Sequence, residues 1–161
     1  MLRDPSLIPL SRQHHYALAL CVRIERSLKA GVTDLEIWQP EIEEHFSQQI
    51  RVHFEAEEAV LFPAAERFAD LSSLVAELRA DHHELRRHFA LASARAMSAS
   101  DLQEFADLLA RHIRKEERDL FEQLQTLMTA DQLHALGTQL DAALQEAIQS
   151  CALPARGPLR S

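Results

Sequence analysis

Apolar residues recur every three or four positions along most of the chain, a pattern that predicts amphipathic helices. No alternating apolar and polar run indicates a strand. Four long helical segments and a shorter fifth are expected at residues 11–30, 33–63, 72–97, 100–128 and 129–149. Pro40 gives an alternative start for the second segment. Long helices joined by short loops favour an all-α, up-down-up-down four-helix bundle with a short fifth C-terminal helix.

Local signals set the expected helix boundaries. Gly31 follows the first segment as a helix-ending residue. Patterns resembling capping boxes begin at Thr33, Ser100 and Thr129, in each case just before an apolar run. Pro63 should end or kink the second helix, because proline lacks the backbone N–H that a helix interior needs.

Length and composition indicate one domain. A chain of 161 residues is long enough for one well-buried core. Only three glycines occur, and residues that favour helices are abundant. We therefore expect a single helical bundle domain over residues 1–150. Residues 151–161, with two prolines and a glycine, are expected to form a flexible tail.

The charge and the hydropathy exclude several kinds of partner. The net charge is −8, from 17 basic and 25 acidic residues. Such a surface argues against binding to nucleic acid or to anionic lipid, because both require Lys and Arg opposite phosphate. No apolar run is long enough to span a bilayer, and the first residues lack a signal-peptide core. Cys21 and Cys151 show no metal or redox spacing, which favours a cytoplasmic location. The sequence indicates no oligomeric state.

One histidine lies on the apolar face of each of the four long helices. These histidines are His14, His53, His82 and His112. His53 is followed four residues later by Glu57, and His112 by Glu116. Residues four apart share one face of a helix, so each pair directs an imidazole and a carboxylate toward the core.

Four imidazoles and two carboxylates in one core require compensation, because an unpaired buried charge is strongly disfavoured. A pair of cations supplies it, since carboxylates bridge metals and neutral imidazoles bind them. The two His-x-x-x-Glu pairs are 59 positions apart (112 − 53 and 116 − 57), and each is preceded by one further histidine. This internal two-fold repeat favours a two-metal centre of iron or manganese inside the bundle.

Other residues give alternatives to this assignment. A single His-x-x-x-Glu is usually a solvated pair, so a bundle without metal is the competing interpretation, although four histidine-bearing stripes argue against it. His15 and His83 would replace their neighbours if the helical register shifted by one residue. His45 either borders the site or, as we favour, lies on the surface. His88 and His134 are expected on the surface or behind the ligands.

The same residues resemble a known family. The segments that carry the likeness are Gln13-His14-His15, His53 to Pro63, Asp81 to Arg86, and His112 to Phe121. They are similar to the hemerythrin-like, or HHE cation-binding, domain over about residues 10–128. The resemblance implies a four-helix bundle around a non-haem centre of two iron ions. It assigns His14, His53, His82 and His112 as terminal ligands and Glu57 and Glu116 as bridges.

The sequence departs from the oxygen-carrying hemerythrins in its third helix. Those proteins are expected to have two histidines four residues apart there, whereas this chain has Arg86 four residues after His82. The chain looks closer to variants with four histidines and two glutamates. Those variants are similar to bacterial di-iron proteins linked to nitric oxide, oxidative stress and iron–sulfur repair. The cysteine-bearing N-terminal extension of many repair proteins is not present in this sequence.

Three functional interpretations follow. The favoured one is a di-iron protein that binds or senses dioxygen or a related small molecule such as nitric oxide or peroxide. The second is a di-iron oxidoreductase that acts in oxidative or nitrosative stress or in iron–sulfur repair. The third is a helical bundle without metal. Zinc or manganese could use similar ligands.

Overall fold

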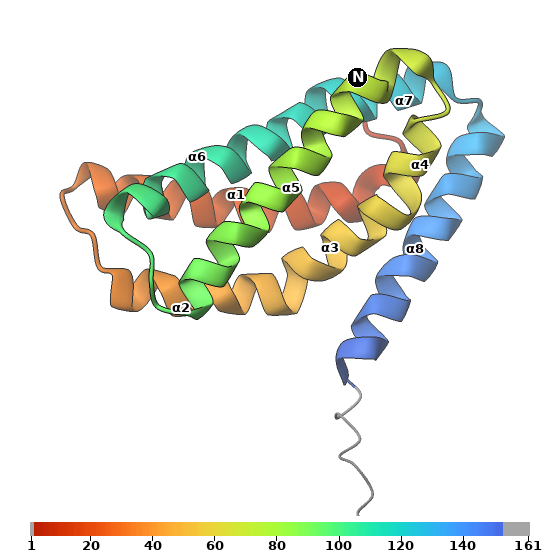
Figure 1. The fold of residues 1–161 in the computed structure, drawn as a ribbon. Coiled ribbons are helices and arrows are strands. Elements are labelled where there is room, and N and C mark those ends of the chain that lie inside the picture. Colours follow the sequence, from red (N-terminus) through yellow and green to blue (C-terminus); the bar gives the residue numbers. More distant parts are fainter. Residues whose placement is uncertain (1, 153–161) are drawn as a thin grey trace, which may run out of the picture.

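The computed structural model describes residues 2–152, and for residues 148–152 it describes the backbone alone. Within this range the chain is helical and contains no strand. Its helices form four long rods and a separate C-terminal helix. Figure 1 shows the rods side by side, with successive rods running in opposite directions, and the C-terminal helix packed on the outside near one end. The expected all-α, up-down-up-down bundle is therefore confirmed.

Two of the four rods are single helices, and two are built from several consecutive helical pieces without a loop. The single helices are α1 (Ile8–Lys29) and α5 (Ser72–Ser93). The second rod consists of α2 (Leu35–His45), η2 (Phe46–Ile50), α3 (Arg51–Ala56), η3 (Glu57–Leu61) and α4 (Phe62–Ala65). The fourth consists of α6 (Ala99–Lys115), η5 (Glu116–Leu120) and α7 (Phe121–Leu127). Short 3-10 turns, η1 (Pro5–Leu7) and η4 (Ala69–Leu71), precede α1 and α5.

The segments η2, η3 and η5 are π turns of five residues each. In each turn the hydrogen bond spans five residues instead of four, as between the N–H of Phe62 and the carbonyl oxygen of Glu57. A π turn adds one residue to the helix and often occurs at a functional site. Glu57 and Glu116 are the first residues of η3 and η5.

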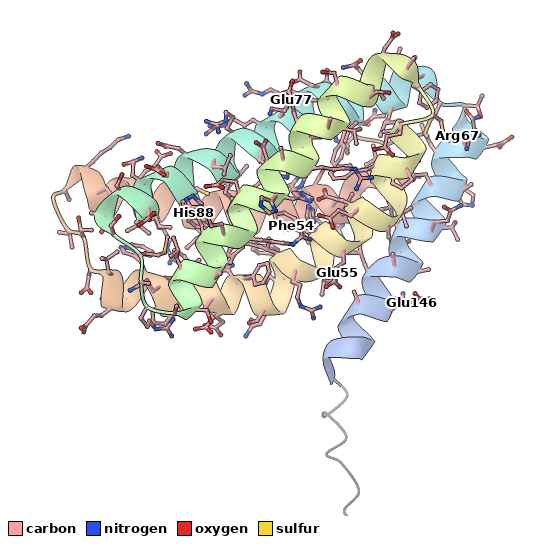
Figure 2. All side chains as sticks on the ribbon, viewed as in Figure 1. Phe54, Glu55, Arg67, Glu77, His88 and Glu146 are labelled. Atoms are coloured by element: carbon pink, nitrogen blue, oxygen red, sulfur yellow. The ribbon has the colours of Figure 1, made fainter. Side chains whose placement is uncertain are left out.

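The core has two apolar clusters. One, which includes Ile24, Phe89 and Phe105, fills the end of the bundle near α2. The other, which includes Leu61, Leu78 and Phe121, fills the opposite end. The histidines and glutamates expected at the centre lie between them along the rods. In Figure 2 the side chain of Phe54 points into the bundle, whereas those of Glu77 and Glu146 point away from it.

The fifth helix, α8 (Ala130–Ala152), is longer than expected, with 23 residues. Leu136, Leu140 and Leu144 are buried in the second cluster, where α8 covers α3 and η3. Gly137 permits close packing of α8 against η1, because a Cβ atom there would lie 2.7 Å from the Cβ of Ser6. The helix includes residues 151 and 152, which were expected to belong to a flexible tail. Residues 153–161 lie outside the described residues.

Most of the expected boundaries agree with the structure. Gly31 has a positive φ of 73° directly after α1, as a helix-ending glycine does. Thr129 caps α8, because its hydroxyl accepts a hydrogen bond from the N–H of Gln132. The capping residues predicted at Thr33 and Ser100 were wrong. Asp34 caps α2, because its carboxylate accepts a hydrogen bond from the N–H of Ile37. Ser98 and Asp101 form the capping box of α6, with both reciprocal hydrogen bonds present. None of the helices among the described residues is both long and apolar enough to cross a lipid bilayer.

Candidate metal centre

All six residues chosen from the sequence lie together in the middle of the bundle. They come from four different rods, and each is at most 5% exposed. Their ligand atoms form two groups, and within each group all the atoms lie within 4.8 Å of one another. The first half of the centre has the imidazoles of His14 and His53, and the second half has those of His82 and His112. Glu57 and Glu116 belong to both groups.

The imidazole nitrogens face each other within each half. The Nε2 atoms of His14 and His53 are 2.9 Å apart, and those of His82 and His112 are 3.1 Å apart. Two ligand atoms that bind one octahedral ion at right angles, each at about 2.1 Å, are about 3 Å apart. The separation in each half is therefore suited to one metal ion.

Each glutamate offers one oxygen to each half. Glu57 Oε1 lies 2.9 Å from His53 Nε2, whereas its Oε2 lies 3.3 Å from His82 Nε2. Glu116 repeats this arrangement in reverse, with Oε2 at 3.1 Å from His14 Nε2 and Oε1 at 3.3 Å from His112 Nε2. Both carboxylates thus have the orientation of bridges between two ions.

The outward-facing nitrogens of the four rings each approach an oxygen acceptor. Three of them are within hydrogen-bond distance: His14 Nδ1 at 2.7 Å from Glu117, His53 Nδ1 at 2.7 Å from Gln13, and His82 Nδ1 at 2.8 Å from Glu58. The fourth, His112 Nδ1, is 3.5 Å from Asp81. Such partners fix the tautomer and the orientation of a metal-binding imidazole.

The three carboxylates among these partners each form an ion pair with a basic side chain. Arg3 contacts Glu117 at 2.7 Å, Arg86 contacts Glu58 at 2.7 Å, and Lys115 contacts Asp81 at 3.2 Å. Glu58 and Glu117 thus each pair with an arginine as well as with an inward-facing histidine. Their hydrogen bonds to His82 and His14 were not predicted from the sequence. The positions of Glu58 and Glu117 directly after the two bridging glutamates are the signal that could have revealed them.

The donor set fits a pair of cations. If each Nδ1 carries the proton, each Nε2 presents a lone pair to the centre, and two lone pairs at about 3 Å repel each other. The four carboxylate oxygens of Glu57 and Glu116 are buried, and none has a hydrogen-bond partner among the described residues. Buried polar atoms are normally satisfied, so unpaired ones require an explanation such as an ion. Cations bound between these atoms satisfy both the nitrogens and the oxygens.

Comparison with known families agrees with this geometry. A family model described as the hemerythrin HHE cation-binding domain matches residues 9–124, which make up most of the chain. The chain belongs to the hemerythrin HHE cation-binding domain family. No curated protein and no solved structure gave a significant match.

The structure places the candidate ligands His14 and His82 of this HHE domain in the core, in the helical register from which they were chosen. His15 and His83, the neighbours that a one-residue shift would have selected, are exposed. Arg86, at the position where a fifth histidine is expected in the oxygen-carrying hemerythrins, contacts Glu58 instead. Glu58 in turn bonds to His82. Arg86 is therefore linked to the HHE centre through the side chains of Glu58 and His82.

Two other histidines differ from their expected places. His88, expected on the surface or behind the ligands, is only 1% exposed and packs against Phe105 within the core. Burial lowers the pKa of His88, so the ring is readily accommodated in its neutral form. His45, for which a surface position was favoured, lines a cavity beside the HHE centre. His134 is exposed, as expected.

In the absence of metal, the glutamates raise the pKa values of His82 and His14. Burial alone would lower the pKa of His82, but Glu57 and Glu58 raise it to about 9. The pKa of His14 is also raised, because Glu116 and Glu117 outweigh the effect of burial. Protons on these rings are therefore the alternative to metal ions as counter-charges for the carboxylates.

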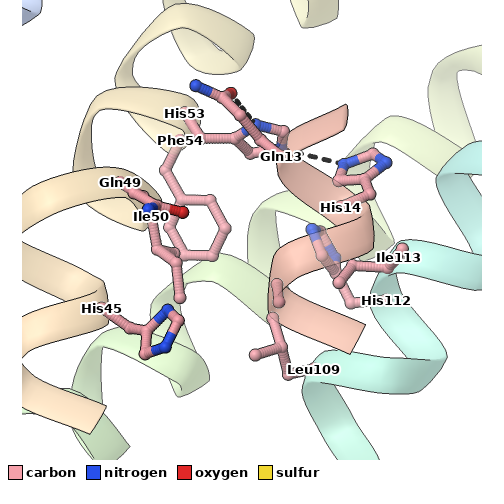
Figure 3. A pocket seen from close by; sticks show the side chains of 11 residues that line it. Gln13, His14, His45, Gln49, Ile50, His53, Phe54, Leu109, His112 and Ile113 are labelled. Carbon is pink, nitrogen blue, oxygen red and sulfur yellow. Dashed lines mark hydrogen bonds between the residues drawn. The ribbon is translucent and has the colours of Figure 1, made fainter. Parts of the chain in front are cut away.

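A cavity adjoins the first half of the HHE centre (Figure 3). Its volume is about 20 Å³ for a water-sized sphere, somewhat more than the roughly 10–15 Å³ that a single water needs. The polar residues that line it are Gln13, His14, His45, Gln49, His53 and His112, and the apolar ones are Ala17, Ile50, Phe54, Leu109 and Ile113. His82 is not among them, and the ring of Phe54 stacks on it at 3.7 Å between ring centroids.

Proposed function

We propose that the protein binds two iron ions at this centre and uses them to bind or sense dioxygen or a related small molecule, such as nitric oxide or peroxide. The observation that carries the proposal is the pair of ligand groups that share Glu57 and Glu116. A shared carboxylate holds two ions at a short, fixed separation. Membership in a cation-binding family supports the same conclusion.

The nature of the donors favours iron over alkaline-earth ions. Each group offers two imidazole nitrogens and two carboxylate oxygens. Imidazole suits iron, copper, nickel and zinc, whereas magnesium and calcium prefer oxygen ligands alone. Iron in turn supplies electrons and open coordination positions to a bound small molecule. The chain contributes only six protein ligands to two ions, which leaves room for such a molecule.

The surrounding residues would control the centre in three ways. The carboxylates of Glu58 and Glu117 and the amide of Gln13 orient the imidazoles through their Nδ1 protons. The apolar clusters at both ends of the bundle exclude bulk water. The cavity beside His53 gives a molecule of a few atoms access to one side. A cytoplasmic location is part of this proposal, because a reducing compartment keeps iron in its ferrous form.

Metal analysis and visible spectra of the protein purified without oxygen test the proposal. We expect two iron ions per chain and a new absorption band when air is admitted. A band that disappears again under argon indicates reversible binding. Continued consumption of added peroxide or nitric oxide would instead point to the oxidoreductase alternative. Folded protein with almost no iron would contradict the proposed function.

Variants assign the metal to this site. His53→Ala should abolish iron retention, because it removes an imidazole from the first half of the centre. His134→Ala is the matched control, since His134 is exposed on α8, and it should retain iron like the parent protein.

A further inference from the structure

The cavity beside the first half is lined at one end by residues from a π turn that holds no metal ligand. Of the three π turns, η3 and η5 begin at the bridging glutamates. The remaining one, η2, provides Gln49 and Ile50 to the cavity, and His45 directly precedes it. Figure 3 shows the His45 ring next to Ile50 and Leu109, at the end of the cavity away from His53 and Gln13.

The π turn explains why His45 reaches the cavity. His45 lies eight residues before His53, and eight residues of regular α-helix leave the two side chains about 80° apart around the axis. A π turn inserts one extra residue. The eight residues then turn the helix by about as much as seven residues of regular α-helix. The side chains of His45 and His53 are therefore only about 20° apart around the axis. His45 therefore projects from nearly the same face as the metal-facing His53.

Helix α6, which carries the corresponding histidine His112, has no π turn at this position. Glu104 lies eight residues before His112, as His45 does before His53. Helix α6 is uninterrupted from Ala99 to Lys115, and Glu104 is exposed. The π turn η2 therefore breaks the internal two-fold repeat at the position where the cavity occurs.

His45 and Gln49 bring an imidazole and an amide to the end of the cavity away from His53, where Ile50 and Leu109 are apolar. The side chain of His45 is 24% exposed, and its Nε2 lies 3.9 Å from Oε1 of Glu41. Glu41 is in turn paired with Arg23. The His45 ring thus lies between solvent and the cavity. Gln49 is half-buried and contributes an amide on the same side.

We propose that His45 and Gln49 bind the outer end of a small ligand in this cavity and so determine which molecules the centre retains. The cavity volume of about 20 Å³ limits the ligand to two or three atoms. The two donors select a molecule with a hydrogen-bond acceptor at its outer end. This inference rests on the proposed function, because the inner end of the ligand would meet the metal ions.

Azide, a linear anion of three atoms, is a suitable probe. Its binding to the iron-loaded protein can be followed by optical titration. His45→Leu should raise the dissociation constant for azide about tenfold, as expected for the loss of one hydrogen bond to a charged group. Gln49→Leu should have a smaller effect in the same direction. His45→Gln keeps an N–H donor and should restore part of the affinity.

Gln48→Leu is the matched control. Gln48 lies on the same π turn, but it is exposed and bonds to Glu44, so azide affinity should not change. Ile50→Phe tests the cavity itself, because the larger ring should fill it and slow the association of both azide and nitric oxide more than tenfold. Xenon should occupy the cavity in pressurised crystals of the metal-free parent protein but not in those of Ile50→Phe.

The outcomes separate this inference from the function on which it rests. An iron-loaded His45→Leu variant whose azide affinity lies within twofold of the parent would overturn the inference alone. Unchanged association rates in Ile50→Phe, or crystals of the parent without xenon in the cavity, would also overturn it. A parent protein that retains no iron would overturn both the inference and the proposed function.

Discussion

The two halves of the metal centre have the same ligand arrangement but different surroundings. Each half has one imidazole pair with Nε2 atoms about 3 Å apart and one oxygen from each bridging glutamate. The cavity is lined by both imidazoles of the first half and, in the second half, by His112 but not His82. In the second half, Phe54 stacks on His82 at 3.7 Å, and Phe62 lies 5.2 Å from the same ring.

Cation binding and access for a small molecule therefore depend on different parts of the structure. In the proposed function, the repeated ligand set would hold the cations, and its placement depends on helix periodicity in both halves. Access for a small molecule would depend on features on the His53 side of the bundle: the π turn η2, the cavity and the polar residues at its end. The cavity meets His14, His53 and His112 but not His82.

The largest effect is expected where the two halves share a ligand. Glu116→Ala removes an oxygen from each group, so both ions should be lost and the iron content should fall from two per chain to near zero. The loss of affinity should exceed the roughly 10–100-fold typical of residues behind the ligands. Metal analysis after desalting measures it. One ion retained per chain would show that the halves bind independently.

The aromatic ring between the cavity and His82 is the next target. Phe54 is buried and contacts the rings of both His82 and His112. Phe54→Ala should lower the free energy of unfolding of the metal-free protein by about 3–5 kcal/mol, because it leaves a large cavity in the core. Ile37→Ala, at an exposed position, should change it by less than about 0.5 kcal/mol. Denaturant titration compares the variants, and similar losses in both would contradict this role for Phe54.

The pH dependence of the metal-free protein tests whether protons replace cations. The pKa of His82 is about 9 in the folded protein, against about 6.5 when unfolded. A raised folded pKa stabilises the protein fully below pH 6.5, and this contribution disappears as the pH rises through 9. The loss for His82 should be at most about 3 kcal/mol. Thermal unfolding between pH 6.5 and 9 measures it, and the iron-loaded protein serves as the control. If the stability of the metal-free protein stayed constant or rose between pH 6.5 and 9, protonated His82 would not be the counter-charge for the carboxylates.

The smallest effect is expected behind the ligands, where the halves differ in chemistry. Gln13 presents a neutral amide to His53, whereas Asp81 presents a carboxylate to His112. Gln13→Ala should weaken iron binding about tenfold, since the ring loses its orienting acceptor. Gln13→Glu should restore the affinity and make the first half resemble the second. Competition with a chelator measures both variants, and an unchanged affinity in Gln13→Ala would mean that packing alone orients His53.

The sequence predicted the parts of the molecule that regular helix geometry determines. His14 and His82 were separated from His15 and His83 by the apolar stripe alone, and the His-x-x-x-Glu spacing placed Glu57 and Glu116 beside their histidines. The position of His45 could not be predicted in this way, because the π turn between His45 and His53 changes the angle per residue. The burial of His88 was also missed, since it depends on how closely α5 packs against α6.

The capping of α6 involves a choice between two nearby serines. Both Ser98 and Ser100 are plausible capping residues, and Asp101 completes the box with Ser98. Local signals of this kind compete over two or three residues, and tertiary packing decides between them. The metal-facing residues were unaffected, because His112 lies more than three turns further along the helix.

A crystal structure of the iron-loaded protein, with anomalous diffraction measured at the iron absorption edge, tests the central claim most directly. The account predicts two anomalous peaks inside the bundle, one between His14 and His53 and one between His82 and His112, with Glu57 and Glu116 contacting both. A single peak, or peaks that lie away from these six side chains, would contradict it.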